Sequence, residues 1–184
     1  MTTSQVCSVV DCEFCSIVNG ELEGEEIYRD DKFVAVLHLK PAAAGHILLF
    51  TQHHYPILEQ VPDFVVGEMF LVANKLSTTI FETLGAEGTN IIIENGVAAG
   101  QGIPHVSVHI IPRRENDGLT KLQWTPKKVN NDEMDVAQYQ IKEQAEKVHP
   151  STFEHEAKKE VVKEEKVEVK KGDDYRINQL RRRP

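Results

Sequence analysis

Residues 95–114, near the middle of the sequence, constrain the fold more than any other stretch. They read NGVAAGQGIPHVSVHIIPRR, in which apolar residues alternate with polar or small ones toward the end. That alternation predicts a half-buried β-strand over 105–112, with the side chains of His105, Ser107 and His109 on one face. The glycine-rich loop before it exposes backbone N–H groups that suit an anionic phosphate. An ordinary strand with two histidines on its wet face is the alternative interpretation.

The flanking sequence predicts the other elements of an α+β domain. Four further short runs have the apolar content and the bounding turn residues of β-strands: 26–29, 33–39, 45–50 and 89–94. Apolar residues at three- and four-residue steps predict one long helix that starts near Asp63 and stops before Gly85. The stripe consists of Val65, Met69, Val72, Ala73, Leu76, Ile80 and Leu84. Five strands with one long helix on one face make an α+β domain.

Composition divides the chain into four predicted segments. Residues 1–10 are expected to be a flexible N-terminus, and residues 11–126 the folded domain. Residues 127–150 are expected to be helical, because apolar residues recur at helical spacing over 132–148 and a proline follows. Residues 151–184 are a charged tail rich in lysine and glutamate. They contain too little apolar surface to be buried, so we expect disorder or a solvated helix.

Charge and cysteine content exclude several classes of protein. The net charge is −8, and the last segment holds slightly more basic than acidic residues, so the folded part is strongly acidic. This argues against a nucleic-acid polymer as the main ligand, because phosphate chains need basic surfaces. No uninterrupted apolar run approaches the length of a membrane span, and the N-terminus lacks the pattern of a secretory signal. With three cysteines, we expect a cytoplasmic protein whose thiols stay reduced.

Cys7, Cys12 and Cys15 open the chain with the spacing C-x4-C-x2-C. An iron–sulfur site needs a fourth cysteine, and a thioredoxin-like pair needs a βαβ context that the strand pattern lacks. A C-x-x-C pair can also supply half of a tetrahedral zinc site, which two histidines complete. Two free buried thiols are the alternative for Cys12 and Cys15, and Cys7 is then a spare thiol.

The block around the histidines resembles the signature of the histidine triad (HIT) family. In that family a loop of the type N-G-x-x-A-G-Q precedes three histidines that alternate with apolar residues. The resemblance runs from about Cys12 to about Pro126 and includes the upstream stretch PAAAGHILLFTQHHY. It implies a five-stranded antiparallel sheet with one long helix, a homodimer, and binding of a purine nucleotide or a related small molecule. The histidine that attacks the α-phosphate in the family is here Ser107.

The resemblance also implies a role for each residue around Ser107. Phosphate binding falls on six residues of the loop and strand: Asn95, Gly100, Gln101, Gly102, Ile103 and His109. His38 stands where the family commonly has an aspartate that accepts hydrogen bonds from ribose hydroxyls. As a neutral ring, His38 can accept such a bond more weakly. In the zinc-binding members, the metal ligands align with Cys12, Cys15, His54 and His105.

The serine at position 107 leaves the chemistry of the site open. A serine hydroxyl is a poor nucleophile without a general base, and His105 is not free to act as one if it binds zinc. His109 could then be the base for Ser107 or a displaced nucleophile. A simple loss of rate is the stronger expectation.

Three functions therefore compete. The first is a HIT-type hydrolase or transferase of reduced or altered activity, acting on a nucleoside phosphoramidate or a dinucleoside polyphosphate. The second is a non-catalytic module that binds a purine nucleotide, and the third is a zinc-stabilised interaction protein. Gly100, Gln101 and His109 favour the first two, because a scaffold has no use for a phosphate loop.

Overall fold

A computed structural model describes residues 12–119 and 130–145 of the chain. The helices and strands follow one another as α1 (Glu13–Val18), β1 (Glu26–Arg29), β2 (Phe33–Leu37), β3 (Ile47–Thr51), α2 (Asp63–Leu84), β4 (Gly88–Ile93), β5 (Ser107–Arg113) and α3 (Asn131–Ala145). Short 3-10 turns at Leu58–Gln60 and Val97–Ala99 lie in the loops before α2 and β5. The predicted N-terminal segment 1–10 and tail 151–184 lie outside the described residues.

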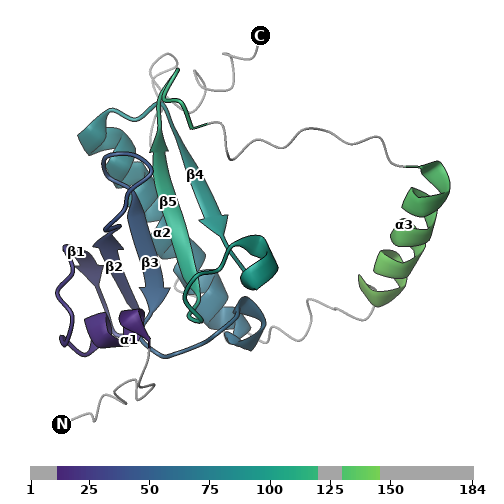
Figure 1. Ribbon diagram of the computed structural model, residues 1–184, viewed down its shortest axis with the longest axis horizontal. Helices are drawn as coiled ribbons and strands as arrows, with labels where there is room; N and C mark the ends of the chain where they lie inside the picture. Colours follow the sequence, from purple (N-terminus) through teal and green to yellow (C-terminus); the bar gives the residue numbers. More distant parts are fainter. Residues whose placement is uncertain (1–11, 120–129, 146–184) are drawn as a thin grey trace, which may run out of the picture. The chain divides into compact units, whose positions relative to one another are not determined.

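The five strands form one antiparallel sheet in the order β1-β2-β3-β5-β4. The long helix α2 runs along one face of this sheet (Figure 1). The predicted fold class, α+β with a five-stranded antiparallel sheet and one long helix, is confirmed. β1 and β4 are the two edge strands, and β5 lies between β3 and β4.

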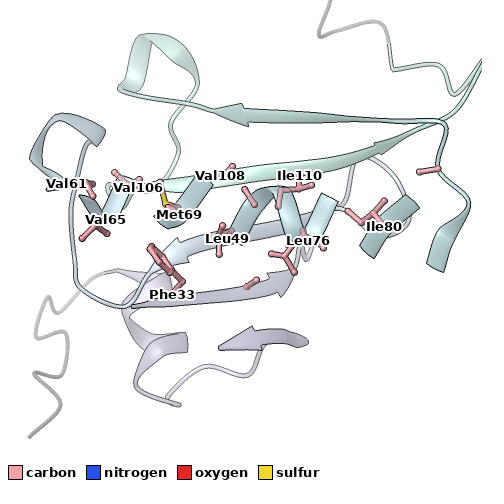
Figure 2. Packing of buried hydrophobic residues seen from close by; sticks show 14 residues of the cluster. Phe33, Leu49, Val61, Val65, Met69, Leu76, Ile80, Val106, Val108 and Ile110 are labelled. Carbon is pink, nitrogen blue, oxygen red and sulfur yellow. The ribbon is translucent and has the colours of Figure 1, made fainter. Parts of the chain in front are cut away.

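The helix α2 forms because its apolar residues recur on one side. Six of its residues are buried, namely Val65, Met69, Ala73, Leu76, Ser77 and Ile80. Figure 2 shows Val65, Met69, Leu76 and Ile80 packed against Leu49, Val108 and Ile110 of the sheet. The helix ends before Gly85, whose left-handed φ of +60° an L-residue rarely adopts.

By length and composition alone, α2 could also cross a membrane. The mean hydropathy of its most apolar 18-residue stretch is 1.3, and 33% of that stretch is buried. Polar side chains interrupt the apolar residues along it. The buried stripe contacts three strands and supplies five of the fourteen buried residues of the main core. We therefore describe α2 as the core helix of the domain.

The opposite face of the sheet carries a second, smaller core. Val34, Val36, Leu48 and Phe50 alternate with the helix-facing residues, so their side chains point away from α2. They pack against α1, which contributes Phe14 and Cys15, and against Cys12 at its start. The sequence did not predict α1, because a helix of only six residues is too short to show an apolar period.

Several element ends differ from the prediction by two residues. The last strand begins at Ser107 rather than His105, because the backbone N–H of His105 bonds back to Ile103 in a turn, 2.7 Å away. The second strand ends at Leu37, because the backbone N–H of Lys40 bonds to the His38 ring instead of continuing the ladder. α3 starts within one residue of the predicted position, and its predicted end at 148 lies outside the described residues.

Candidate functional site

Ser107 and His109 lie on the face of the sheet that α2 does not cover. In the ladder with β3, Ser107 is opposite Phe50 and His109 is opposite Leu48. Both partners belong to the second core, whereas the intervening Val108 belongs to the helix-side core. The predicted alternation is therefore correct, and the two polar side chains share one face.

A cavity of about 130 Å³ opens above Ser107. Its lining comprises Phe14, His38, Glu94, Gln101, Gly102, Ile103, Ser107 and His109. The structure thus brings together six of the residues to which the sequence assigned phosphate, ribose or catalytic roles. Asn95 and Gly100 are not among the lining residues.

The side-chain amides of Asn95 and Gln101 are hydrogen-bonded to the loop and to the segment before α2. Gln101 accepts a hydrogen bond from the backbone N–H of Gly96 at 2.7 Å and donates to the carbonyls of Pro56 and Ile103 at 2.7 and 3.0 Å. Asn95 accepts from the backbone N–H of Leu58 at 2.9 Å and donates to Glu59 at 2.8 Å. These bonds fix the shape of the loop. With the side-chain amides occupied, the backbone N–H groups of the loop are the donors left for a phosphate.

Three imidazoles form a connected group beside Ser107. His46 Nε2 lies 3.1 Å from His109 Nδ1. The His38 ring stacks on His46 with 4.6 Å between centroids, and its centroid lies 5.8 Å from that of His109. The turn before His46 depends on Gly45 (φ +87°), where a Cβ would lie 2.3 Å from the side chain of Leu84.

Hydrogen bonds from the backbone determine where the protons of these rings lie. The Ala42 N–H donates to His46 Nδ1 at 3.1 Å, so the proton of a neutral His46 is on Nε2. That Nε2–H donates to His109 Nδ1, which leaves the proton of His109 on its own Nε2. The Lys40 N–H donates to His38 Nδ1 at 2.9 Å, so His38 also keeps its proton on Nε2.

Burial keeps all three rings neutral at pH 7. It lowers the pKa of His46 to about 4, with the neighbouring His38 and His109 acting in the same direction. It also lowers the pKa of His38 and of His109, while the charge of Glu94 acts in the opposite direction on both. His38 and His109 therefore present N–H donors to the cavity, which suit a ligand oxygen.

This proton arrangement affects two predicted roles, that of His109 as a base and that of His38 as a hydrogen-bond acceptor. His109 can act as a base toward Ser107 only if the protons of His46 and His109 are first redistributed. His38 meets the cavity as a donor, because its acceptor nitrogen is already bonded to the backbone. The arrangement suits the binding of an anion better than the activation of a serine.

A second group of polar side chains lies beneath α1. Cys12, Cys15, His54 and His105 bring one ligand atom each to within 4.8 Å of one another. The Sγ of Cys12 is 3.4 Å from His105 Nδ1, and the Sγ of Cys15 is 3.3 Å from His54 Nδ1. All four residues predicted as metal ligands are thus brought together, and three of them are buried.

The donor set fits a tetrahedral metal ion. His105 donates its Nε2–H to the carbonyl of Thr51 at 2.9 Å, so Nδ1 presents a lone pair toward the two sulfurs. Burial lowers the pKa of His105 to about 4, which keeps that lone pair available at pH 7. Two sulfurs and two nitrogens, with one ring oriented by a carbonyl, match a structural zinc site. Cys15 also takes part in a disulfide bond, so metal binding requires its reduced form.

Phe14 connects this cluster to the cavity. It lies between Cys12 and Cys15 in the sequence, stacks on Phe50 at 4.5 Å and meets the edge of His105 at 5.7 Å. The same ring lines the cavity above Ser107. Whatever holds α1 on the sheet therefore also holds one wall of the cavity.

The sequence interpretation assigned no role to three residues of this site: Phe14, His46 and Glu94. The position of Phe14 could not be predicted, because α1 is too short to show an apolar period. His46 stands in the quoted stretch PAAAGHILLFTQHHY, but only the structure shows that it contacts His109. Glu94 ends a predicted strand. It lies two residues after Ile92, which is opposite His109, so strand periodicity alone places its side chain on the same face as His109.

Comparison with known families decides the relationship of the chain. A profile of the HIT domain matches residues 19–116, more than half of the sequence. The chain belongs to the HIT domain family. The matched region of this HIT protein begins just after α1 and contains all five strands, α2 and every cavity-lining residue except Phe14.

Two relatives illustrate the match. The adenylylsulfatase HINT3 of Arabidopsis thaliana is 40% identical over 109 residues, which are 59% of this chain and 55% of that protein. The adenosine 5'-monophosphoramidase HNT1 of Candida albicans is 27% identical over 147 residues, which are 78% of this chain and 97% of that protein. The chain spans about half the length of the first relative and nearly all of the second.

Solved structures show the same fold. A HIT family protein from Bacillus anthracis has a TM-score of 0.66 at 27% identity, and the match covers 77% of this chain and 100% of that one. A zinc-bound histidine triad family protein from Mycobacterium smegmatis has a TM-score of 0.58 at 29% identity, covering 76% and 98%.

Proposed function

We propose that this HIT protein binds the phosphoryl group of a purine nucleotide in the cavity above Ser107 and hydrolyses nucleoside phosphoramidates at a reduced rate. The observation that carries the proposal is the convergence of the His38 and His109 N–H groups, the Ser107 hydroxyl and the open loop at Gly102 on one cavity. Donors preorganised in a partly buried site bind phosphoryl oxygens well. The two named relatives act on an adenylyl sulfate and an adenosine monophosphoramidate, which supports the ligand class.

A reduced rate follows from the residue at the attacking position. A neutral imidazole can attack phosphorus, whereas a serine hydroxyl must first lose its proton to a base. His109, two residues further along the same face, carries its second nitrogen as N–H and is therefore a donor. Pure nucleotide binding without turnover is the alternative.

Ligand-dependent thermal stability tests the proposed ligand class. A ligand that binds only the native state must raise Tm, and by an amount that grows with its concentration. We expect AMP or GMP to raise the Tm of the full-length protein by several degrees at roughly 100 times Kd, and ribose or adenosine to raise it less. If no nucleotide in the panel shifts Tm, the interaction-protein function takes first place.

We further propose that the metal of the Cys12, Cys15, His54 and His105 cluster is zinc. Two thiolates with two imidazoles are a donor set that zinc prefers. The zinc-bound relative from Mycobacterium smegmatis supports this choice. Metal binding requires Cys15 as a free thiolate rather than in the disulfide of this structure, so we also propose a reducing compartment such as the cytoplasm.

We propose that the protein is a homodimer joined at the β4 edge. The Ser77 hydroxyl lies 2.7 Å from that of Thr89, which sets one side of α2 against β4. Phe70 and Leu84 lie seven residues before and after Ser77 on that side, and they are 44% and 41% exposed. Ile91 on β4 is 40% exposed. An apolar strip beside an unpaired strand edge suits a second copy of the chain.

The edge strands offer a matched pair of substitutions for this proposal. We expect Ile91→Lys on β4 to convert the protein to a monomer at micromolar concentration, because it puts a charge into the apolar strip. Ile27→Lys on β1, where the isoleucine is 44% exposed at the opposite edge, should leave the dimer intact. Light scattering after gel filtration measures both. A wild-type monomer, or two variants that behave alike, would contradict the proposed interface.

A further inference from the structure

Glu94 lies next to Ser107 on the neighbouring strand of the sheet. The β4–β5 ladder ends with Ile93 opposite Val108, so one further residue in the same register places Glu94 opposite Ser107. Residues opposite one another in an antiparallel pair project on the same face. Glu94 accordingly lines the cavity together with Ser107 and His109.

Gly100 leaves space for the Glu94 side chain. Its backbone has a φ of +101°, and a Cβ there would lie 3.3 Å from the carboxylate of Glu94. Within residues 12–119 and 130–145, the carboxylate forms no ion pair and no hydrogen bond. The charge of Glu94 is thus left for solvent or for a ligand.

The rest of the cavity does not neutralise this charge. His38 and His109 are neutral rings that offer N–H donors, and Ser107 is uncharged. The field of Glu94 reaches both rings, since it opposes the effect of burial on each of them. A cavity with neutral donors and one carboxylate accepts a phosphoryl group, repels each further negative charge and attracts a nearby positive one.

We propose that Glu94 is a specificity-determining residue that selects a ligand with a positive charge close to its phosphoryl group. The ligand class is a nucleoside 5'-phosphoramidate of a basic amine, in which an ammonium group pairs with the Glu94 carboxylate. Polyphosphorylated ligands are disfavoured, because their additional phosphates meet that carboxylate. The inference rests on the proposed function and adds to it the charge of the amine that the phosphoramidate carries.

Two isosteric ligands test the proposal. The adenosine 5'-phosphoramidate of ethylenediamine ends in an ammonium group, and that of propylamine ends in a methyl group at the same place. We expect the full-length protein to bind the ethylenediamine compound roughly twofold to fivefold more tightly by calorimetry, the range for an exposed ion pair. In Glu94→Gln the two affinities should become equal, and ATP should gain affinity relative to AMP.

Glu82→Gln is the matched control, because Glu82 is an exposed carboxylate on α2, on the other side of the sheet. It removes the same formal charge and should retain the preference for the ammonium ligand. In the wild-type protein alone, the preference should shrink as salt is raised, since ion pairing at an exposed carboxylate is screened.

The possible outcomes separate this inference from the proposed function. Equal binding of the two ligands by the wild type, or a preference that survives in Glu94→Gln, overturns the role of Glu94. If AMP binds in either case, the nucleotide pocket stands. If neither AMP nor the two phosphoramidates bind, the proposed function falls and the inference falls with it.

Discussion

Replacing Ser107 with histidine is expected to raise the rate of adenosine phosphoramidate hydrolysis by roughly 100-fold or more. The cavity of about 130 Å³ above Ser107 leaves space for an imidazole. A neutral ring at this position attacks phosphorus without a separate base, and the phosphoramidate that it forms is readily hydrolysed. The neighbouring His109 N–H is already placed to hold a phosphoryl oxygen.

Ser107→Ala is the control for this prediction. If serine is not the nucleophile, the alanine variant should keep the slow wild-type rate, measured as amine release under saturating substrate. Fast wild-type turnover that Ser107→Ala abolishes would instead make serine the nucleophile. The restored rate should remain below that of a complete triad, because His38 presents a donor to the sugar and Glu94 adds a negative charge.

Removing the proposed zinc ion is expected to lower Tm by about 10 °C. A metal bound far above its dissociation constant stabilises the native state by about 4 kcal/mol, and a domain of this size loses roughly 2–4 °C per kcal/mol. The four ligands join α1 to two distant segments of the chain, so the second core depends on them. Because Phe14 moves with α1, nucleotide affinity should fall as well.

Two cysteine variants make the zinc prediction specific. Cys12→Ser should abolish stoichiometric zinc and reproduce the loss of Tm, whereas Cys7→Ser should retain both. Metal analysis of untagged protein gives the stoichiometry, and chelation followed by zinc addition gives the Tm change. Protein oxidised at Cys15 should take up zinc only after reduction, since a disulfide sulfur is not a thiolate ligand. A reduced wild type without zinc would contradict the assignment.

The sequence was sufficient for the fold because the periods of α2 and β5 are unambiguous. The stripe from Val65 to Ile80 recurs at helical steps, and the alternation around Ser107 and His109 has a period of two. Both patterns arise because one face of each element is buried, and that face takes apolar side chains. The end residues were less predictable, since side-chain hydrogen bonds such as the one from Lys40 to His38 decide where pairing stops.

The site was less predictable than the fold, because it depends on contacts between distant residues. The proton positions of His46 and His109 follow from a backbone bond at Ala42, which no sequence pattern shows. The role of Glu94 depends on its register opposite Ser107 and on the space at Gly100. The amide of Asn95, expected at the phosphate, bonds within the loop region instead.

Calorimetric titration of AMP into the full-length protein tests the nucleotide pocket most directly. We expect one AMP per chain with a Kd in the micromolar range, and an affinity about tenfold weaker in His109→Ala, which removes the N–H donor. His53→Ala, which alters an exposed histidine outside the cavity, should bind AMP as the wild type does. An absence of AMP binding, or equal affinity in the wild type and His109→Ala, would contradict a phosphoryl site above Ser107.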